Sequence, residues 1–155
     1  MKRLPLLATA FVAVVGVTVF AAEEIKLEGI KCVMNPKGPA MLEKSVDFKG
    51  GKVFFCCDNC PKGFTAKVEA EDAIVIAKGN KQLVQTKQAV QEKCPFTGGP
   101  LKTELDVDGA VVQSCCDKCL GKAKKLKGDE QLTQLFGDEA FTAAGFKVPA
   151  AEAAE

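Results

Sequence analysis

Eight cysteines carry the chemistry that this sequence points to. They form two sets of four, in each of which a lone cysteine precedes a Cys-Cys-x-x-Cys cluster. The first set is Cys32, Cys56, Cys57 and Cys60, and the second is Cys94, Cys115, Cys116 and Cys119. Histidine is absent, which excludes Ser-His-Asp and Cys-His catalytic sites and metal sites with imidazole ligands. Any chemistry of this chain must therefore come from sulfur.

The spacing within each set is typical of a metal site. A structural zinc site needs four ligands at about 2.0–2.3 Å, drawn from two chain segments that a fold brings together. At a helix start, Cys60 shares a face with Cys57 or Cys56, and the exposed amides there favour thiolates. Adjacent strand residues point to opposite faces, so either the chain turns between Cys56 and Cys57 or one of them is not a ligand. We predict one ion per set, with all eight cysteines as candidate ligands.

Zinc is the expected cofactor and copper the alternative. Four thiolates suit the tetrahedral preference of zinc, whereas the general order of affinities lets copper compete where it is available. Iron–sulfur clusters also use four thiolates, but an oxidising, exported setting disfavours them.

The two sets belong to an internal repeat. The three cluster cysteines of the second set follow those of the first at a constant offset of 59 residues, and the lone cysteines differ by 62. Gly38-Pro39 and Gly99-Pro100 also correspond. A duplication of one unit explains this agreement.

Each repeat is predicted to contain a strand, a hairpin and a helix. Alternating apolar and polar residues predict the strands, glycine-containing turns predict the hairpins, and an aspartate in each cluster predicts a helix cap. In the first repeat these elements are a strand at 25–28, hairpin strands at 45–48 and 52–55, and a helix from Asp58 through Val68. In the second they are a strand at 88–91, hairpin strands at 105–107 and 110–112, and a helix from Asp117 through Lys127.

The segments outside the repeats are predicted to complete a shared core. Residues 73–77 and 83–85 are apolar and favour packing of the two lobes against each other. Asp129 and Asp138 are expected to start two short helices after the second repeat.

The first repeat resembles a known family. A hairpin leads into Cys56-Cys57-Asp58-Asn59-Cys60, Phe64 follows, and Cys32 precedes it, a pattern that resembles the YHS and TRASH group of cysteine-rich domains. The resemblance covers residues 30–68 and, more weakly, 93–126. It implies a treble-clef-like zinc-finger fold and the binding or sensing of metals, zinc and copper included.

The sequence departs from that family in two ways. Asn35 and Thr97 stand where the family commonly has a second cysteine in its first knuckle, and Cys57 and Cys116 would restore a set of four thiolates. The second repeat has also lost its aromatic residues. Gln113, Ser114 and Ala123 match Phe54, Phe55 and Phe64. Its core is expected to be thinner, so that a metal or disulfides would matter more to its folding.

The expected fold is a small α+β protein with two treble-clef-like ββα units packed together. We divide the chain into a signal peptide at 1–21, the first cysteine-rich repeat at 22–80, the second at 81–128, C-terminal helices at 129–148 and a disordered tail at 149–155.

Two alternatives to metal binding come from the same cysteines. An even number of cysteines in a small exported protein is typical of a disulfide-stapled scaffold or interaction protein. A Cys-x-x-Cys motif at a helix start is also found in thiol-disulfide oxidoreductases, but here the βαβ context of those enzymes is missing. We predict a structural or metal-handling role and no enzymatic activity.

The N-terminus predicts export. Lys2 and Arg3 precede an apolar run from Leu4 to Phe20, and small residues allow cleavage after Ala21 or Ala22. The mature protein is expected to be periplasmic or secreted, and a membrane anchor follows only if this segment stays uncleaved. The near-neutral charge, +1 for the whole chain, gives no support for nucleic-acid binding. The expected partners are a metal ion and other exported proteins.

Overall fold

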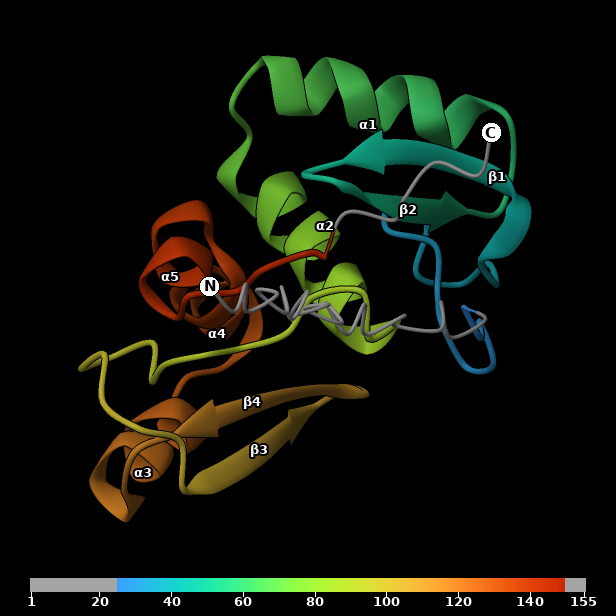
Figure 1. Ribbon diagram of the computed structural model, residues 1–155. Coiled ribbons are helices and arrows are strands. Elements are labelled where there is room, and N and C mark those ends of the chain that lie inside the picture. Colours follow the sequence, from blue (N-terminus) through green and yellow to red (C-terminus); the bar gives the residue numbers. More distant parts are fainter. Residues whose placement is uncertain (1–24, 150–155) are drawn as a thin grey trace, which may run out of the picture.

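The computed structural model describes residues 25–149, so the predicted signal peptide and most of the predicted tail lie outside the described residues. Within this range the chain forms two hairpins, each followed by helices (Figure 1). The elements are β1 (Met41–Phe48), β2 (Gly51–Phe55), α1 (Asn59–Glu69), α2 (Ala73–Gln85), β3 (Thr103–Val107), β4 (Ala110–Ser114), α3 (Asp117–Lys125), α4 (Gly128–Phe136) and α5 (Asp138–Ala143).

The two hairpins form where the sequence predicts them. β1 pairs antiparallel with β2, and β3 pairs antiparallel with β4. Both two-residue turns, Lys49-Gly50 and Asp108-Gly109, have positive φ at each position, from 50° to 84°. Such turns match the twist of the flanking strands, and glycine adopts this conformation without steric cost. Each hairpin and the helix after it make one ββα unit: β1, β2 and α1 form the first, and β3, β4 and α3 the second.

The strands predicted at 25–28 and 88–91 are wrong. These segments are irregular, because the backbone of neither forms a ladder with a strand. Only isolated bridges occur nearby, between Lys31 and Pro39 and between Val90 and Lys147. The alternation at 25–28 instead places Ile25 and Leu27 against a small apolar cluster.

The predicted helix caps also need correction. Asp58 occupies the cap position of α1, but its side chain accepts no bond from a helix amide and pairs with Lys44 instead. In the second unit the cap residue of α3 is Cys116, and Asp117 is the first helical residue. Both helices nevertheless start inside the cysteine cluster, as predicted.

Helix α2 connects the two units. Its N-terminus is capped by Asp72, whose carboxylate accepts hydrogen bonds from the amides of Ile74 and Val75 at 3.2 and 3.1 Å. In Figure 1 this helix runs between the first unit and the second, and it spans residue 80, the predicted boundary between the repeats. The apolar segments predicted to supply a shared core are therefore the two ends of one helix.

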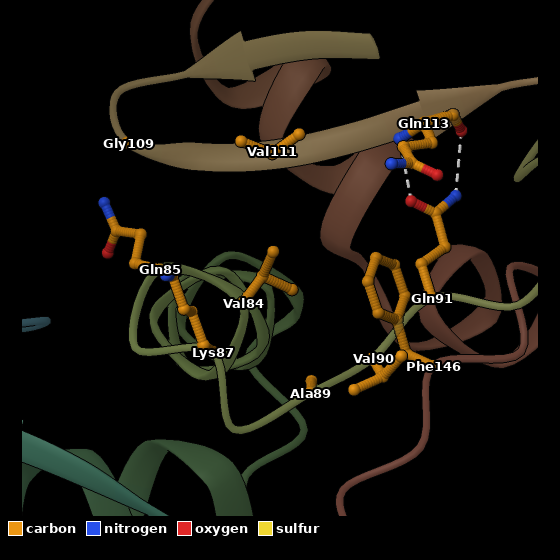
Figure 2. Close-up of a pocket in the computed structure, with 10 residues that line it drawn as sticks. All are labelled: Val84, Gln85, Lys87, Ala89, Val90, Gln91, Gly109, Val111, Gln113 and Phe146. Carbon is orange, nitrogen blue, oxygen red and sulfur yellow. Dashed lines mark hydrogen bonds between the residues drawn. The ribbon is translucent and has the colours of Figure 1, made fainter. Parts of the chain in front are cut away.

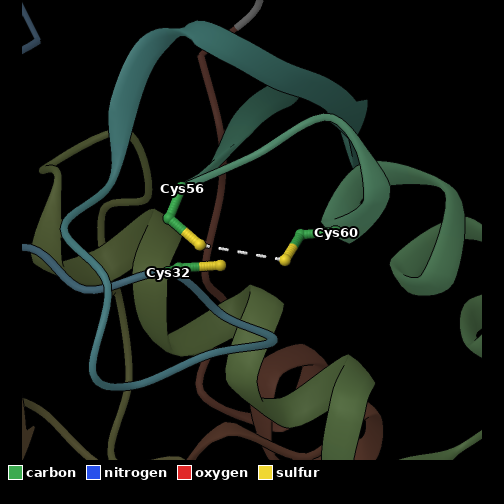
Figure 3. A group of neighbouring side chains, drawn as sticks. All are labelled: Cys32, Cys56 and Cys60. Carbon is green, nitrogen blue, oxygen red and sulfur yellow. Dashed lines mark hydrogen bonds between the residues drawn. The ribbon is translucent and has the colours of Figure 1, made fainter.

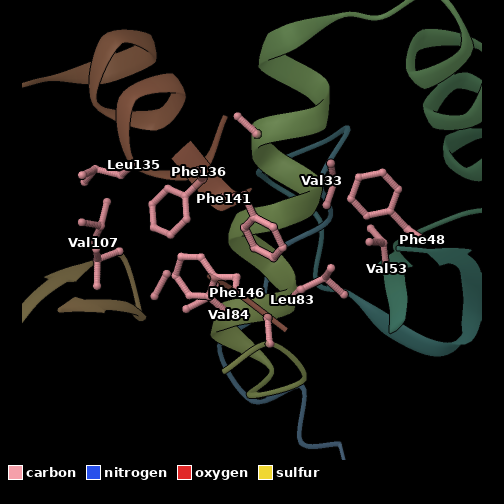
Figure 4. Close-up of a cluster of buried hydrophobic side chains, with 14 of the residues drawn as sticks. Val33, Phe48, Val53, Leu83, Val84, Val107, Leu135, Phe136, Phe141 and Phe146 are labelled. Atoms are coloured by element: carbon pink, nitrogen blue, oxygen red, sulfur yellow. The ribbon is translucent and has the colours of Figure 1, made fainter. Parts of the chain in front are cut away.

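One continuous apolar core extends across both units. Figure 4 shows side chains gathered on either side of α2, with Phe48 and Val53 from the first unit and Phe136 from α4 among them. Helices α4 and α5, at the places predicted for the C-terminal helices, contribute Phe136 and Phe141 to this cluster. The prediction of two ββα units packed together is confirmed.

Candidate metal centre

The first cysteine group consists of Cys32, Cys56 and Cys60. Their sulfur atoms all lie within 4.8 Å of one another, and Cys56 Sγ is 3.9 Å from Cys60 Sγ (Figure 3). Four sulfurs bound to one ion at about 2.3 Å in a tetrahedron would lie about 3.8 Å apart. The spacing of this triad is therefore that of thiolates around a single metal ion.

Three separate chain segments position this triad. Cys32 lies in a loop that closes on itself, where its amide donates to the carbonyl of Gly38 at 3.0 Å. Cys56 directly follows the last residue of β2, and Cys60 is the second residue of α1. The hairpin folds the cluster back over the loop, so a cysteine distant in sequence meets two that are close together in the chain. Cys32 is buried at this junction.

The second cysteine group repeats the arrangement. The sulfurs of Cys94, Cys115 and Cys119 also lie within 4.8 Å of one another, with Cys115 Sγ 3.7 Å from Cys119 Sγ. The amide of Cys94 donates to the carbonyl of Gly99 at 2.9 Å, which closes the same kind of loop. Cys94 and Cys119 are buried. The duplication has thus preserved the arrangement of three sulfurs.

Cys57 and Cys116 lie outside these triads. Each is exposed at the rim of its site, with Cys57 Sγ 3.3 Å from Cys60 Sγ and Cys116 Sγ 3.7 Å from Cys115 Sγ. Of each vicinal pair, the first cysteine is in the triad and the second is beside it. The chain turns from strand to helix between the two, which is one of the arrangements that the sequence allows. The prediction that all eight cysteines are ligands stays a prediction.

A glycine lies against the first cluster cysteine in both loops. A Cβ atom at Gly38 would lie 2.8 Å from Cys56 Cβ and 2.9 Å from its sulfur, closer than real contacts of this kind. At Gly99 the matching distances to Cys115 are 3.2 and 3.7 Å. The Gly-Pro dipeptides found in both repeats therefore make room for a cluster cysteine, more tightly in the first unit.

Asn35 and Thr97 contact sulfur directly. Asn35 Nδ2 lies 3.9 Å from Cys56 Sγ, and Thr97 Oγ1 lies 3.1 Å from Cys115 Sγ. The sequence identifies these positions only as departures from the family pattern. Each polar side chain faces the first cluster cysteine from the loop of the lone cysteine, where it can donate a hydrogen bond to a thiolate.

The thiols of the first site differ in acidity. Burial raises the pKa of Cys60, and the hydrogen bond that it shares with Cys57 raises it further. That same hydrogen bond, with backbone amides at the helix start, lowers the pKa of Cys57. Burial opposes ionisation of Cys32, but hydrogen bonds from backbone amides outweigh it and lower the pKa of Cys32. A metal ion that binds here must displace the proton held by Cys60.

The second site shows the same gradient. Burial opposes ionisation of Cys94, yet the hydrogen bond from Thr97 and nearby backbone amides lower its pKa to about 6. Burial and hydrogen bonds with Cys115 and Cys116 raise the pKa of Cys119 to about 12. The backbone amide of Cys119 and the neighbouring thiols lower the pKa of Cys116. In both units, then, the lone cysteine and the exposed cysteine ionise more easily than the helix cysteine, which is Cys60 or Cys119.

All eight cysteines lie within the described residues, and none forms a disulfide. Among residues 25–149, no helix combines the length and the apolar character needed to cross a membrane. Comparison of the chain with protein-family models, with curated proteins and with solved structures finds no match. The resemblance to the YHS and TRASH group is therefore supported only by two cysteine triads placed like metal sites, each next to a hairpin.

A cavity of about 580 Å³ reaches the buried Cys32 from the side of α2. Lys31, Lys78 and Lys81 line it, and Lys81 is paired with Asp108 at 2.7 Å. The sequence does not predict this cavity, because its walls come from four separate parts of the chain: the loop of Cys32, helix α2, the second hairpin and helix α4. It lies next to the first triad.

Proposed function

We propose that this protein binds two thiophilic metal ions, one in each cysteine triad, and serves in metal handling or as a metal-stabilised exported module. The observation that carries the proposal is the convergence of three sulfurs at both sites, within 4.8 Å of one another. A disulfide joins sulfurs only in pairs, and two bridges among the four cysteines of a set do not require three sulfurs to lie within 4.8 Å of one another. Three mutually close sulfurs fit a metal ion better than a disulfide framework.

Zinc is the ion that we favour. Structural zinc sites hold four ligands in a closed tetrahedron, so each triad needs one more donor. Cys57 and Cys116 are the natural fourth ligands, because each lies within 3.7 Å of a triad sulfur and rotation about its χ1 angle can turn it toward the ion. Their lowered pKa favours the thiolate that the metal requires.

Copper(I) is the second candidate, and the three-sulfur geometry is the observation in its favour. Soft thiolates select copper(I), and three sulfurs would be enough to hold it without the exposed cysteine. The two ions thus differ in whether they need Cys57 and Cys116 for coordination. Zinc requires them as ligands, whereas copper(I) leaves them free at the rim.

Export is the remaining part of the proposal. The signal sequence at 1–21, cleaved after Ala21, would deliver the mature chain to the periplasm or beyond the cell. Free thiols oxidise readily in such a compartment, and metal binding would protect them. The resemblance to the YHS and TRASH group agrees with metal handling, and no enzymatic activity is part of the proposal. An intact mass that starts at Ala22 or Glu23 would support export, and an uncleaved chain in the cytoplasm would contradict it.

Elemental analysis combined with a count of free thiols tests the proposal. The mature chain, purified without chelator, is expected to contain two metal ions and thiols that become reactive only after the metal is removed. The Cys60→Ser and Cys119→Ser variants should each lose one ion. Cys57→Ser and Cys116→Ser are the matched controls: with zinc they weaken binding, and with copper(I) they leave it unchanged. Fully oxidised cysteines without metal would overturn the proposal in favour of the disulfide scaffold.

A further inference from the structure

One glutamine side chain connects the two chain segments that carry the ligands of the first site. The amide group of Gln82, in α2, accepts a hydrogen bond from the Phe54 amide at 2.6 Å and donates to the Phe54 carbonyl at 3.0 Å. It also donates to the carbonyl of Lys31 at 2.9 Å. Phe54 lies two residues before Cys56, and Lys31 directly precedes Cys32. Gln82 thus holds the strand that leads to one ligand against the loop of another.

A second glutamine makes the same three bonds at the second site. The amide group of Gln91 accepts from the Gln113 amide at 2.7 Å and donates to the Gln113 carbonyl at 2.8 Å, as Figure 2 shows. It donates to the carbonyl of Lys93 at 2.8 Å as well. Gln113 lies two residues before Cys115, and Lys93 directly precedes Cys94.

The repeat does not account for this agreement. Phe54 and Gln113 correspond at the offset of 59 residues, but Gln82 and Gln91 are only nine residues apart and belong to different parts of the fold. Gln82 lies in α2, and Gln91 in the irregular segment after it. In both units, therefore, a glutamine joins the residue two before the strand-end cysteine to the residue just before the lone cysteine. The two glutamines belong to different parts of the fold. Such agreement indicates that the bridge itself matters to the site.

A third glutamine provides the contrast. Gln88 accepts from the Lys52 amide and donates to the Lys52 carbonyl, both at 2.7 Å, so it pairs with the same edge of β2 in the same way. Its remaining bond goes to the Thr86 hydroxyl and not to the loop of Cys32. Gln88 therefore stabilises the strand edge without joining the two ligand-bearing segments.

We propose that Gln82 and Gln91 are positioning residues that set the distance between the lone cysteine and the strand-end cysteine of each metal site. The inference rests on the proposed function, because it assigns these residues a role in metal affinity. An ion at about 2.3 Å from each sulfur tolerates only small errors in ligand position. Residues that orient metal ligands from outside the coordination sphere change metal affinity about tenfold to 100-fold when they are replaced.

The test uses the mature chain loaded with cadmium and followed by cadmium NMR, in which each thiolate site gives its own resonance. The Cys60→Ser and Cys119→Ser variants assign the two resonances. Competition with a chelator then measures the cadmium affinity of each site in Gln82→Met, Gln91→Met and the control Gln88→Met. Methionine keeps the length of the side chain but cannot form these hydrogen bonds.

Gln82→Met should weaken the first site about tenfold to 100-fold and leave the second unchanged, and Gln91→Met should do the reverse. Gln88→Met should change neither affinity. If Gln82→Met, which alters a buried residue, does not fold, the half-buried Gln91 decides the question. Unchanged affinities in a chain that binds two cadmium ions would overturn this inference alone, as would a loss in Gln88→Met equal to that in Gln82→Met. A wild-type chain that binds no cadmium would overturn the proposed function and this inference with it.

Discussion

The two ββα units hold their sulfurs in the same way although their interiors differ. In the first unit, Phe64 packs against Phe48 and Phe55 with ring centroids 5.3 Å apart in each pair. In the second unit, Ala123 occupies the position of Phe64 and Ser114 that of Phe55. The cysteine triad is nevertheless equally tight. Its geometry therefore depends on a closed loop, a strand end and a helix start, and not on aromatic packing.

The missing aromatic residues of the second unit are replaced from elsewhere in the chain. Leu135 and Phe136 of α4 are fully buried in the same core cluster as Val107 and Val112 of the second hairpin. The side chain of Asn80 in α2 donates to the carbonyl of Phe136 at 2.8 Å, which ties α4 to the central helix. The second unit thus depends on its neighbours and, under the proposed function, on its metal more than the first does.

Loss of one metal site should affect the two units unequally. Structural zinc supplies on the order of 10 kcal/mol of folding free energy to small zinc fingers. Cys119→Ser should remove one ion and unfold residues 103–125, whereas Cys60→Ser should remove one ion and leave β1, β2 and α1 folded on their aromatic core. Metal content and amide hydrogen exchange of each variant measure these effects.

The opposite pattern would contradict the greater dependence of the second unit on its metal. In that pattern Cys60→Ser unfolds the first unit, while Cys119→Ser leaves the second protected from exchange. Cys57→Ser and Cys116→Ser separate the loss of a ligand from the loss of packing, because their side chains are exposed and contribute little to the core.

Removal of the central aromatic residue of the first unit should destabilise the whole fold. Phe64 is only 1% exposed and packs on two other rings, so Phe64→Ala should cost about 3–5 kcal/mol of unfolding free energy. Metal content should stay at two ions, because Phe64 contributes no ligand. Chemical denaturation measures the first effect. A loss below about 1 kcal/mol would mean that the first unit does not rely on its aromatic core.

The glycines of the two loops offer a smaller, graded comparison. In Gly38→Ala the new methyl group would overlap Cys56 and displace a ligand, so affinity at the first site should fall about tenfold to 100-fold. In Gly99→Ala the corresponding contact with Cys115 is looser, and the loss should be smaller. Chelator competition on the two variants compares them directly. Equal losses would show that the closeness of Gly38 to Cys56 has no effect on binding.

The smallest effect is expected at Ser114. Its side chain is 1% exposed, and its Oγ has no hydrogen-bond partner among residues 25–149. A buried hydroxyl without a partner is unfavourable, so Ser114→Ala should raise the unfolding free energy by about 1 kcal/mol or leave it unchanged. Thermal unfolding measures the difference. A clear destabilisation would indicate that the hydroxyl serves the second site in the metal-bound state.

Much of this fold and of its site follows from local patterns in the sequence. The glycine-containing segments 49–51 and 108–109 predict the hairpins, and the cluster spacing predicts that strand ends and helix starts bring sulfurs together. Helix α2 was predicted only as apolar segments, because its buried and exposed residues reflect contacts with both units rather than one amphipathic face. The false strands at 25–28 and 88–91 show that alternation alone does not supply a pairing partner.

The roles of the bridging glutamines cannot be predicted from such patterns. Gln82 and Gln91 act through backbone groups, whose positions depend on the folded chain, and no residue type marks those groups in the sequence. Which cysteine of each vicinal pair belongs to the triad likewise depends on where the chain turns. Cys56 joins the triad and Cys57 does not, because the strand ends at Phe55 and the helix begins at Asn59.

X-ray absorption spectroscopy of the zinc-loaded mature chain tests the central claim most directly. If each triad holds one ion, the spectrum should show three to four sulfur neighbours at about 2.3 Å per zinc, with two zinc ions per chain. A shell made mainly of oxygen or nitrogen at about 2.0 Å, or a chain that retains no zinc when its cysteines are reduced, would contradict it.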